Sequence, residues 1–290
     1  MKKAYIFAGV AILCWSTLAT VSKLLLNTMN SYQVLAYSAL FAFLALLIVN
    51  LCTGRLALLK TYRAKDYGKI LLMGSLGTFF YYVFYYAGTA RMEASQAFIV
   101  NYLWPIMSVA FACLILKEKL TARKWAAFAL SFLGVLTVAG EGLLHFEKGT
   151  LVGILLCFLG AVSYGAFCAL GCKWKYDDLL SMMISFFVSS VCSFLLTLCT
   201  GEMGRIGVPH LLGFAFSGVF VMAVATVAFA MALKLGGSAK ISNLAYITPF
   251  LSLVWTCVVL HEKIKIFSIL GLVLIILGVF IQLKDRKVSK

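Results

Sequence analysis

Residues 101–119 read NYLWPIMSVAFACLILKEK, and 144 positions later residues 245–263 repeat the pattern as AYITPFLSLVWTCVVLHEK. Both copies show an apolar helix with a mid-span proline, a short Glu-Lys turn, and then a helix with a late glycine. A self-similarity at a fixed period indicates an internal repeat. The matched positions are Pro105 with Pro249, Ser108 with Ser252, Leu116 with Leu260, Glu118 with Glu262, Lys119 with Lys263, and Gly134-Val135 with Gly278-Val279.

Long apolar stretches flank both copies along the whole chain. Its 290 residues are 63% hydrophobic and only 12% charged, whereas a soluble domain carries about 25% charged residues. A membrane-spanning helix needs about 20 mainly apolar residues, and segments such as 270–277 lack the alternation of a β-barrel strand. We therefore expect an all-α integral membrane protein with ten transmembrane helices. The charge-free stretches are 4–22, 24–54, 70–90, 94–116, 125–140, 149–172, 179–201, 206–233, 241–260 and 266–283.

The basic residues predict the orientation of these helices. With the N-terminus inside, 19 of the 25 Lys and Arg residues fall in cytoplasmic segments and 6 fall outside, as the positive-inside rule requires. Both termini are then cytoplasmic, and we expect a multi-pass protein of the bacterial inner membrane with an uncleaved first helix. The net charge of +15 indicates contact with anionic membrane lipids rather than a nucleic-acid partner.

The repeat unit contains five predicted helices, covering residues 1–145 and 146–290. An odd number of spans turns the second copy upside down in the membrane, so the fold class includes two inverted five-helix repeats around a central cavity. Inverted repeats are typical of alternating-access transporters with a midplane substrate site. Pro105 and Pro249 each remove a backbone donor, which predicts hinges or cavity walls, although kinks that serve only packing remain an alternative.

At these residues the chain resembles the drug/metabolite transporter superfamily, EamA type. The resemblance rests on the tandem five-helix units, on Trp15-Ser16 in the first helix, and on the proline and Glu-Lys pattern. The segment 101–105, NYLWP, is also similar to the branch of aromatic amino-acid exporters. The family implies ten helices around a cavity lined by helices 1, 3, 4, 6, 8 and 9, and export or exchange of small metabolites. The second copy, YITP at 246–249, has no tryptophan matching Trp104, so the two cavity walls are not equivalent.

The ionisable residues avoid the predicted spans. All three histidines and every acid fall in loops or at helix ends, whereas proton-driven carriers usually hold an ionisable group at depth. We therefore expect facilitated diffusion or exchange. No catalytic motif, metal-ligand cluster or cofactor motif is present, so we predict no enzyme activity, no metal and no cofactor. The acids are Asp66, Glu93, Glu118, Glu141, Glu147, Asp177, Asp178, Glu202, Glu262 and Asp285.

Polar and aromatic side chains remain as candidates for substrate binding. Asn101, Trp104 and Ser108 share one helix face, and an unpaired amide in hydrocarbon costs roughly 2–7 kcal/mol. Similar groups occur on helices 1, 3, 6 and 9, although core packing or the interfacial aromatic belt is an alternative for each. The candidates are Trp15, Ser22, Thr78, Tyr82, Tyr85, Asn101, Trp104, Ser108, Tyr164, Tyr246 and Thr248.

The sequence therefore predicts a secondary transporter that exports small metabolites, foremost amino acids, with aromatic or hydrophobic amino acids as one candidate class. An importer or exchanger of a nucleoside or cofactor precursor is an alternative, and a non-transporting membrane scaffold is the alternative from another class. The expected partners are the small-molecule substrate and the membrane lipids. A monomer is sufficient for this function, and the sequence leaves the oligomeric state open.

Overall fold

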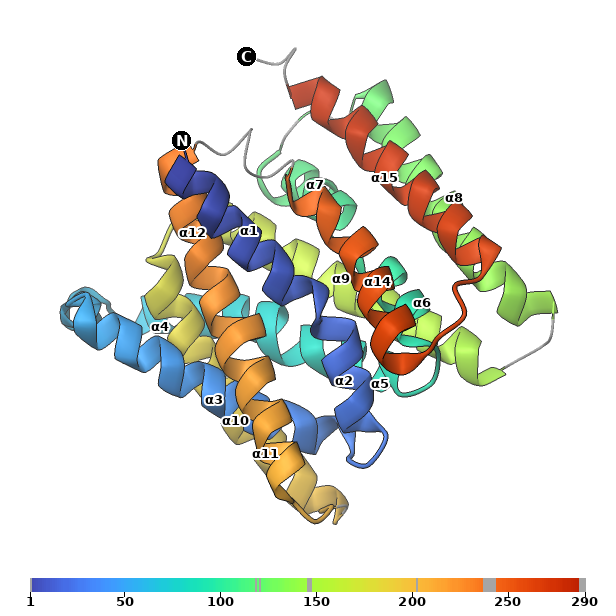
Figure 1. The fold of residues 1–290 in the computed structure, drawn as a ribbon. Coiled ribbons are helices and arrows are strands. Elements are labelled where there is room, and N and C mark those ends of the chain that lie inside the picture. The colour runs from blue at the N-terminus through green and yellow to red at the C-terminus, as the bar shows by residue number, and fades with distance from the viewer. Residues whose placement is uncertain are drawn as a thin grey trace.

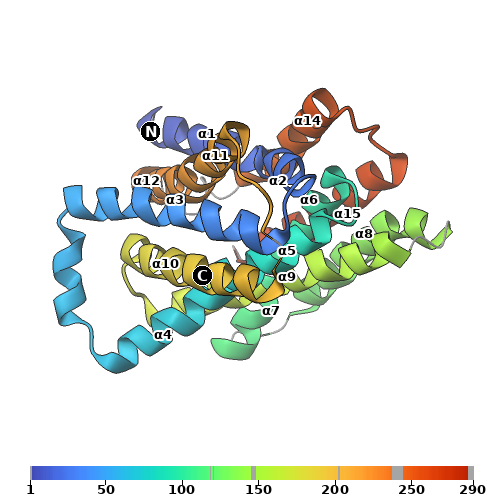
Figure 2. The same ribbon diagram turned by 90° about the horizontal axis from the view of Figure 1, so that it is seen from below.

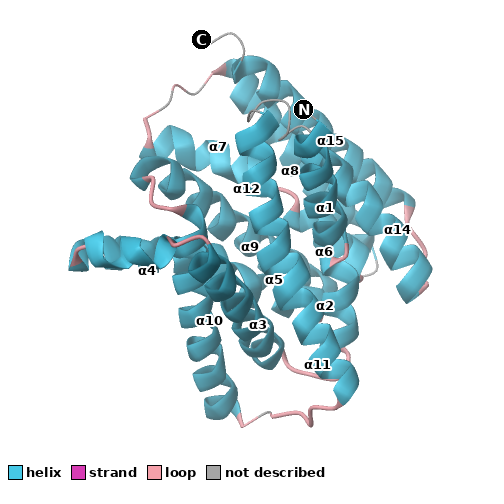
Figure 3. Ribbon diagram, turned by 60° about the vertical axis from the view of Figure 1, so that its left-hand side comes forward, coloured by secondary structure: helices cyan, strands magenta, loops and turns pink. Residues whose placement is uncertain are grey.

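The computed structural model describes residues 2–117, 119, 121–144, 148–201, 203–236 and 244–286, and Glu118 lies outside these ranges. Within them the chain forms helices joined by short loops and no strand (Figure 3). Seven of the described helical segments are long and apolar enough to cross a membrane. They are Lys2–Leu26, Ser31–Cys52, Ala64–Thr89, Ala94–Ile115, Lys148–Trp174, Asp178–Thr200 and Val208–Ala232.

Several of these spans are interrupted and carry more than one element. In chain order the spans contain α1 (Lys2–Ser16) and α2 (Leu18–Leu26), α3 (Ser31–Cys52), α4 (Ala64–Gly74), η2 (Ser75–Phe80) and α5 (Tyr81–Thr89), α6 (Ala94–Asn101) and α7 (Trp104–Ile115), α9 (Lys148–Trp174), α10 (Asp178–Thr200), and α11 (Val208–Ala215), η3 (Phe216–Val224) and α12 (Ala225–Gly236). The other helices are η1 (Arg55–Thr61), α8 (Ala122–Leu144), η4 (Ala245–Ile247), α14 (Thr248–Leu260) and α15 (Ile266–Arg286).

The two repeated prolines start helices rather than kink them. Helix α6 ends at Asn101, and Pro105 lies in the first turn of α7. Pro249 has the same place in α14, after the short 3₁₀ segment η4. Proline is tolerated in the first turn because those N–H groups have no partner within the helix. Each proline therefore marks a break in its span, which is sharper than the predicted kink.

Two π-helical segments interrupt the spans that contain η2 and η3. One covers Ser75–Phe80 and the other covers Phe216–Val224. The offset of 144 residues carries 75–80 onto 219–224, inside the second segment. The π turns that interrupt α-helices are frequently found at functional sites, and here they occupy positions that correspond under the 144-residue offset.

Helices α8 and α15 lie side by side along one edge of the molecule (Figure 1) and run in opposite directions. Their backbones approach closely at glycines: a Cβ on Gly134 would lie 2.7 Å from the carbonyl oxygen of Gly271, and one on Gly278 would lie 2.8 Å from that of Ala127. The 144-residue offset converts one of these contacts into the other, because position 127 maps to 271 and position 134 maps to 278. The contact is therefore the same on both helices.

Helices α3 and α10 form a second close antiparallel pair (Figure 2). The Asn50 amide donates to the carbonyl oxygen of Leu179 at 3.3 Å, and the Ser190 hydroxyl donates to that of Ala36 at 2.9 Å. Side-chain hydrogen bonds to backbone carbonyls join helices where no water is available. These two antiparallel pairs are among the most extensive helix contacts of the described chain.

Candidate functional site

Four tyrosines of α5 form the centre of a buried aromatic cluster. Tyr81, Tyr82, Tyr85 and Tyr86 are all at most 8% exposed, so none of them lies on the lipid-facing surface. The Tyr81 ring lies 4.9 Å from that of Tyr164 on α9, measured between centroids. Helix α5 therefore presents phenol rings inward, where aromatic pairs stabilise the packing.

Trp104 joins this cluster from α7. Its ring is half-buried and meets Tyr164 edge-on, with centroids 5.2 Å apart and an interplanar angle of 81°. The ring centroids of Tyr102 and Trp104 lie 6.5 Å apart. Trp104, Tyr81 and Tyr164 thus bring α5, α7 and α9 together around flat apolar surfaces.

Asn101 supplies an unpaired polar atom next to these rings. It is the last residue of α6 and is 3% exposed, and its amide nitrogen donates to the Tyr81 hydroxyl at 2.9 Å. Its side-chain oxygen has no hydrogen-bond partner among the described residues. A buried unsatisfied amide oxygen is destabilising by about 1–3 kcal/mol and calls for an explanation, such as a bound ligand.

The second repeat meets the first at two matched tyrosines. Tyr102 and Tyr246 differ by 144 positions, and their ring centroids lie 6.4 Å apart. The Tyr102 hydroxyl donates to the carbonyl oxygen of Ala245 at 2.5 Å. Thr248 is buried, and its hydroxyl has no hydrogen-bond partner in the described chain. The candidate Tyr246 therefore packs against Tyr102, and the candidate Thr248 lies buried at the start of α14, two residues further along the chain.

Tyr102 and Tyr81 were missed as site residues by the sequence analysis. The match of Tyr102 with Tyr246 in the 144-residue register is a signal that could have identified the first. No sequence signal identifies Tyr81 among four nearby tyrosines, because its role depends on the position of Asn101.

The candidates of the first span lie beside a second group of hydroxyls. Trp15 packs against Phe229 of α12 with centroids 4.9 Å apart. Ser22 is buried and donates to the carbonyl oxygen of Leu18 at 2.6 Å. The Tyr86 hydroxyl lies near Ser22 but forms no hydrogen bond of good geometry within the described residues. Trp255 of α14, which the sequence analysis did not select, donates to the Ser16 hydroxyl at 2.9 Å.

Thr78 and Ser108 are held in helix contacts. The Thr78 hydroxyl donates to the carbonyl oxygen of Gly74 and bonds Ser189 of α10 at 2.5 Å. At Ser108 the backbone of α7 packs closely on α9, because a Cβ on Gly165 would lie 2.7 Å from the Ser108 nitrogen. Thr78 is thus directed at α10, whereas Tyr82 and Tyr85 belong to the aromatic cluster.

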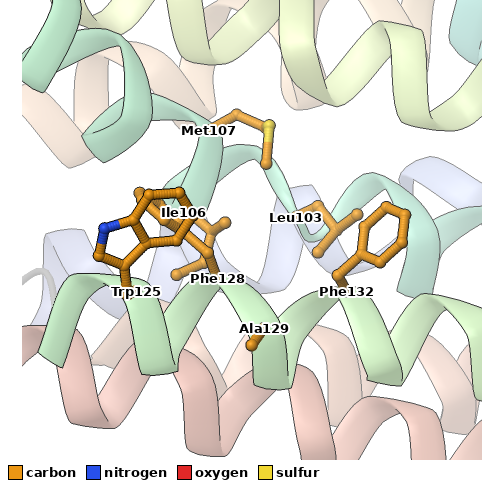
Figure 4. Close-up of a pocket in the computed structure, with 7 residues that line it drawn as sticks. All are labelled: Leu103, Ile106, Met107, Trp125, Phe128, Ala129 and Phe132. Carbon is orange, nitrogen blue, oxygen red and sulfur yellow. The ribbon is translucent and has the colours of Figure 1, made fainter. Parts of the chain in front are cut away.

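A pocket of about 290 Å³ lies between α7 and α8 (Figure 4). All its lining side chains are apolar, and Trp125 at one end is 62% exposed. A site for a polar metabolite needs some placed polar groups, so this groove fits hydrocarbon chains of the membrane better than a substrate. Its lining residues are Leu103, Ile106, Met107, Trp125, Phe128, Ala129 and Phe132.

Comparison with known proteins agrees with this architecture. The model of the EamA-like transporter family matches residues 2–140 and 151–283. An "uncharacterized transporter" of Clostridium kluyveri is 25% identical over 99% of this chain and 95% of its own length. The Bacillus subtilis "uncharacterized transporter" YdfC is 27% identical over 78% of this chain and 74% of its own length, and YvbV is 25% identical over 90% and 88%.

A solved crystal structure of a protein with 19% identity superimposes over 100% of both chains with a TM-score of 0.69, which shows a shared fold. The family match covers nearly the whole chain and confirms the resemblance noted in the sequence. This multi-pass helical membrane protein belongs to the EamA-like transporter family.

Proposed function

We propose that this transporter exports small zwitterionic or neutral metabolites, foremost aromatic or hydrophobic amino acids, across the bacterial inner membrane by alternating access. The observation that carries the proposal is the unpartnered, buried amide oxygen of Asn101. The amide nitrogen of Asn101 donates to the Tyr81 hydroxyl, and the Tyr81 ring belongs to the aromatic cluster with Tyr164 and Trp104. An amide acceptor next to flat apolar walls suits a ligand with one N–H donor group and one apolar side chain.

The charges of the described chain support this substrate class. Asp66, Glu93, Asp177 and Glu262 lie at helix ends or in loops, and Asp178 is the first residue of α10. Sugar phosphates would require buried Arg or Lys side chains that pair with the phosphate, whereas the buried Lys124 donates to the carbonyl oxygen of Lys119 at 2.9 Å, near the start of α8. The same placement favours facilitated diffusion or exchange, so substrate accumulation that collapses with a protonophore would contradict this part of the proposal.

The transport mechanism needs two halves of opposite orientation. We infer ten crossings with both termini in the cytoplasm, and a boundary between the repeats near residues 145–146. The Gly134–Gly271 contact and the Ala127–Gly278 contact map onto each other under the 144-residue offset. Matching residues of two copies contact each other in this way across a two-fold axis, so this symmetry supports a two-fold axis perpendicular to α8 and α15. The two π-helical segments lie at positions that correspond under the 144-residue offset. The family model matches the chain twice, at 2–140 and at 151–283. Both observations support a division of the chain into two repeats.

A thermal-shift screen of the purified protein with an amino-acid library tests the substrate class. A ligand that binds only the native state raises the apparent melting temperature. We expect Asn101→Ala and Trp104→Ala to abolish the shift while the protein stays folded. Trp125→Ala is the matched control, because this exposed tryptophan lies on the apolar groove. Normal binding by both helix variants would refute the site.

Counterflow in proteoliposomes then measures transport of the ligand that the screen identifies. We expect Trp104→Ala to abolish exchange of labelled for unlabelled substrate, and Trp125→Ala to retain it. A ligand that binds but is not exchanged by the native protein would contradict the transport proposal while leaving the binding site intact.

A further inference from the structure

The loop after α14 reaches the start of α6 (Figure 1). Glu262 lies in this loop, and its two carboxylate oxygens accept hydrogen bonds from the backbone N–H groups of Ala94, at 2.7 Å, and Ser95, at 3.0 Å. The first N–H groups of a helix have no partner within the helix, and a carboxylate there is also favoured by the helix dipole. The second repeat thus caps a helix of the first.

Glu93 immediately precedes α6, at the position whose side chain usually accepts hydrogen bonds from the first backbone N–H groups of a helix. It is the N-cap residue of α6 but forms no capping hydrogen bond with its own helix. Its carboxylate pairs instead with Lys265, at 3.4 Å, in the same loop as Glu262. The two repeats have therefore exchanged partners: the local carboxylate contacts the distant loop, and the distant carboxylate caps the local helix.

Lys23 of α2 connects a third segment to the region between α5 and α6. Its ammonium group donates to the carbonyl oxygens of Thr89, at 2.9 Å, and Met92, at 2.5 Å, at the end of α5 and in the turn before α6. A cation is favoured where helix carbonyls have no partner. Helix α2, the corner between α5 and α6, and the loop after α14 are therefore joined at one end of the bundle.

We propose that Glu262 is the latch of the external gate. In the proposed topology this end faces the outside, so these contacts join the outer ends of α2, α5, α6 and α14. When the gate opens, Glu262 leaves α6 and Glu93 turns back to cap its own helix. Each state then keeps a carboxylate on the first N–H groups of α6, so the gate opens without leaving them unpaired. The inference rests on alternating access as proposed above.

Labelling of a buried reporter from outside the cell tests the latch. Thr20 lies on α2, one turn from Lys23, and is 4% exposed. The Thr20→Cys variant is treated with a membrane-impermeant maleimide. Mass spectrometry of the digested protein then measures labelling of the peptide that contains position 20 separately from labelling of the native cysteines. We expect Glu262→Gln to raise the initial labelling rate about tenfold, the effect of weakening one charge-assisted contact.

Lys265→Gln is the matched control in the same loop. It removes the partly exposed pair with Glu93 and leaves the cap by Glu262, so we expect a change of less than about twofold. Adding Glu93→Gln to Glu262→Gln removes the replacement cap, and we expect labelling at least about threefold slower than with Glu262→Gln alone. Equal rates in these two variants would refute the exchange of caps.

Two results would overturn the latch itself. One is an unchanged labelling rate at position 20 in folded Glu262→Gln, and the other is labelling only in inside-out vesicles. Amide hydrogen exchange provides an independent measurement: Ala94 and Ser95 should exchange faster in Glu262→Ala than in the native protein, and unchanged exchange would contradict the cap. Because neither experiment needs a substrate, failure of the amino-acid screen leaves these results interpretable.

Discussion

The contact between α8 and α15 and the aromatic cluster around Trp104 use opposite kinds of packing. In the first, glycines bring two backbones together, so that an added Cβ would clash with a carbonyl oxygen. In the second, large rings meet at centroid distances near 5 Å, and Asn101 keeps an unpartnered oxygen. The first contact cannot accommodate a larger side chain at its glycines. The second contains the half-buried ring of Trp104 and a hydrogen-bond acceptor, the Asn101 oxygen, that has no partner among the described residues. The comparison separates a rigid frame from a region suited to binding.

Gly134→Ala should give the largest effect because it breaks the frame. The new Cβ would lie 2.7 Å from the backbone oxygen of Gly271, and overpacking costs typically about 1–3 kcal/mol. We expect a fall in the melting temperature of the purified protein. Gly9→Ala is the control, because nothing lies within 4 Å of its added Cβ. Equal melting temperatures for the two variants would show that α8 and α15 tolerate separation.

Asn101→Leu should separate binding from stability. Leucine has a similar size and removes an amide whose oxygen has no partner, so we expect stability within about 1 kcal/mol of the native protein. Ligand affinity should fall at least about tenfold, because the substrate loses its hydrogen-bonding partner. Isothermal titration with the ligand from the screen measures both the affinity and the stoichiometry. Unchanged affinity would move the binding site away from α6.

Tyr81→Phe should have a smaller effect, because it removes only the group that orients Asn101. The amide nitrogen then loses its acceptor at 2.9 Å, and we expect about threefold weaker binding, the size of a modest net hydrogen bond. Tyr85→Phe is the companion variant, since the Tyr85 hydroxyl has no hydrogen-bond partner among the described residues. A larger loss with Tyr85→Phe would mean that Tyr85 contacts the ligand directly.

Arg55→Gln should give the smallest effect, because it lies outside both regions of the comparison. The Arg55 guanidinium meets the Asp177 carboxylate at 3.2 Å, and both side chains are about one-quarter exposed. Exposed ion pairs contribute about 0–1 kcal/mol, so both stability and ligand affinity should stay close to native values. A clear loss of affinity would show that the corner between η1 and α10 takes part in the transport cycle.

Sequence patterns predicted the helical class and the family because hydrophobic length and the 144-residue repeat are properties of the chain itself. They also selected Trp104, Tyr82, Tyr85 and Tyr164, which the structure brings into one cluster. The placement of Thr78 could not be predicted, since the hydroxyl that bonds it belongs to Ser189, 111 residues away. The same holds for Glu262: the sequence places it in the repeated Glu-Lys turn, but its partners are the backbone N–H groups of Ala94 and Ser95, more than 160 residues away.

The proline positions show the same limit on a local scale. Pro105 and Pro249 predict a disturbance of each span, because proline lacks the N–H group that a helix interior needs. Whether the span kinks or breaks depends on what replaces the missing bond. Here the Tyr102 hydroxyl donates to the carbonyl oxygen of Ala245, 143 residues further along the chain, so the break between α6 and α7 is joined to a distant contact near Pro249.

By itself the sequence determined that this chain is helical, belongs in a membrane and contains a repeat, because these follow from the number and order of apolar residues. The tertiary structure alone decided which polar atoms remain unpaired and which carboxylate caps which helix. Hydrophobic burial is non-directional and is encoded along the chain, whereas a hydrogen bond requires a donor and an acceptor within about 3 Å, and only the fold brings such distant atoms together.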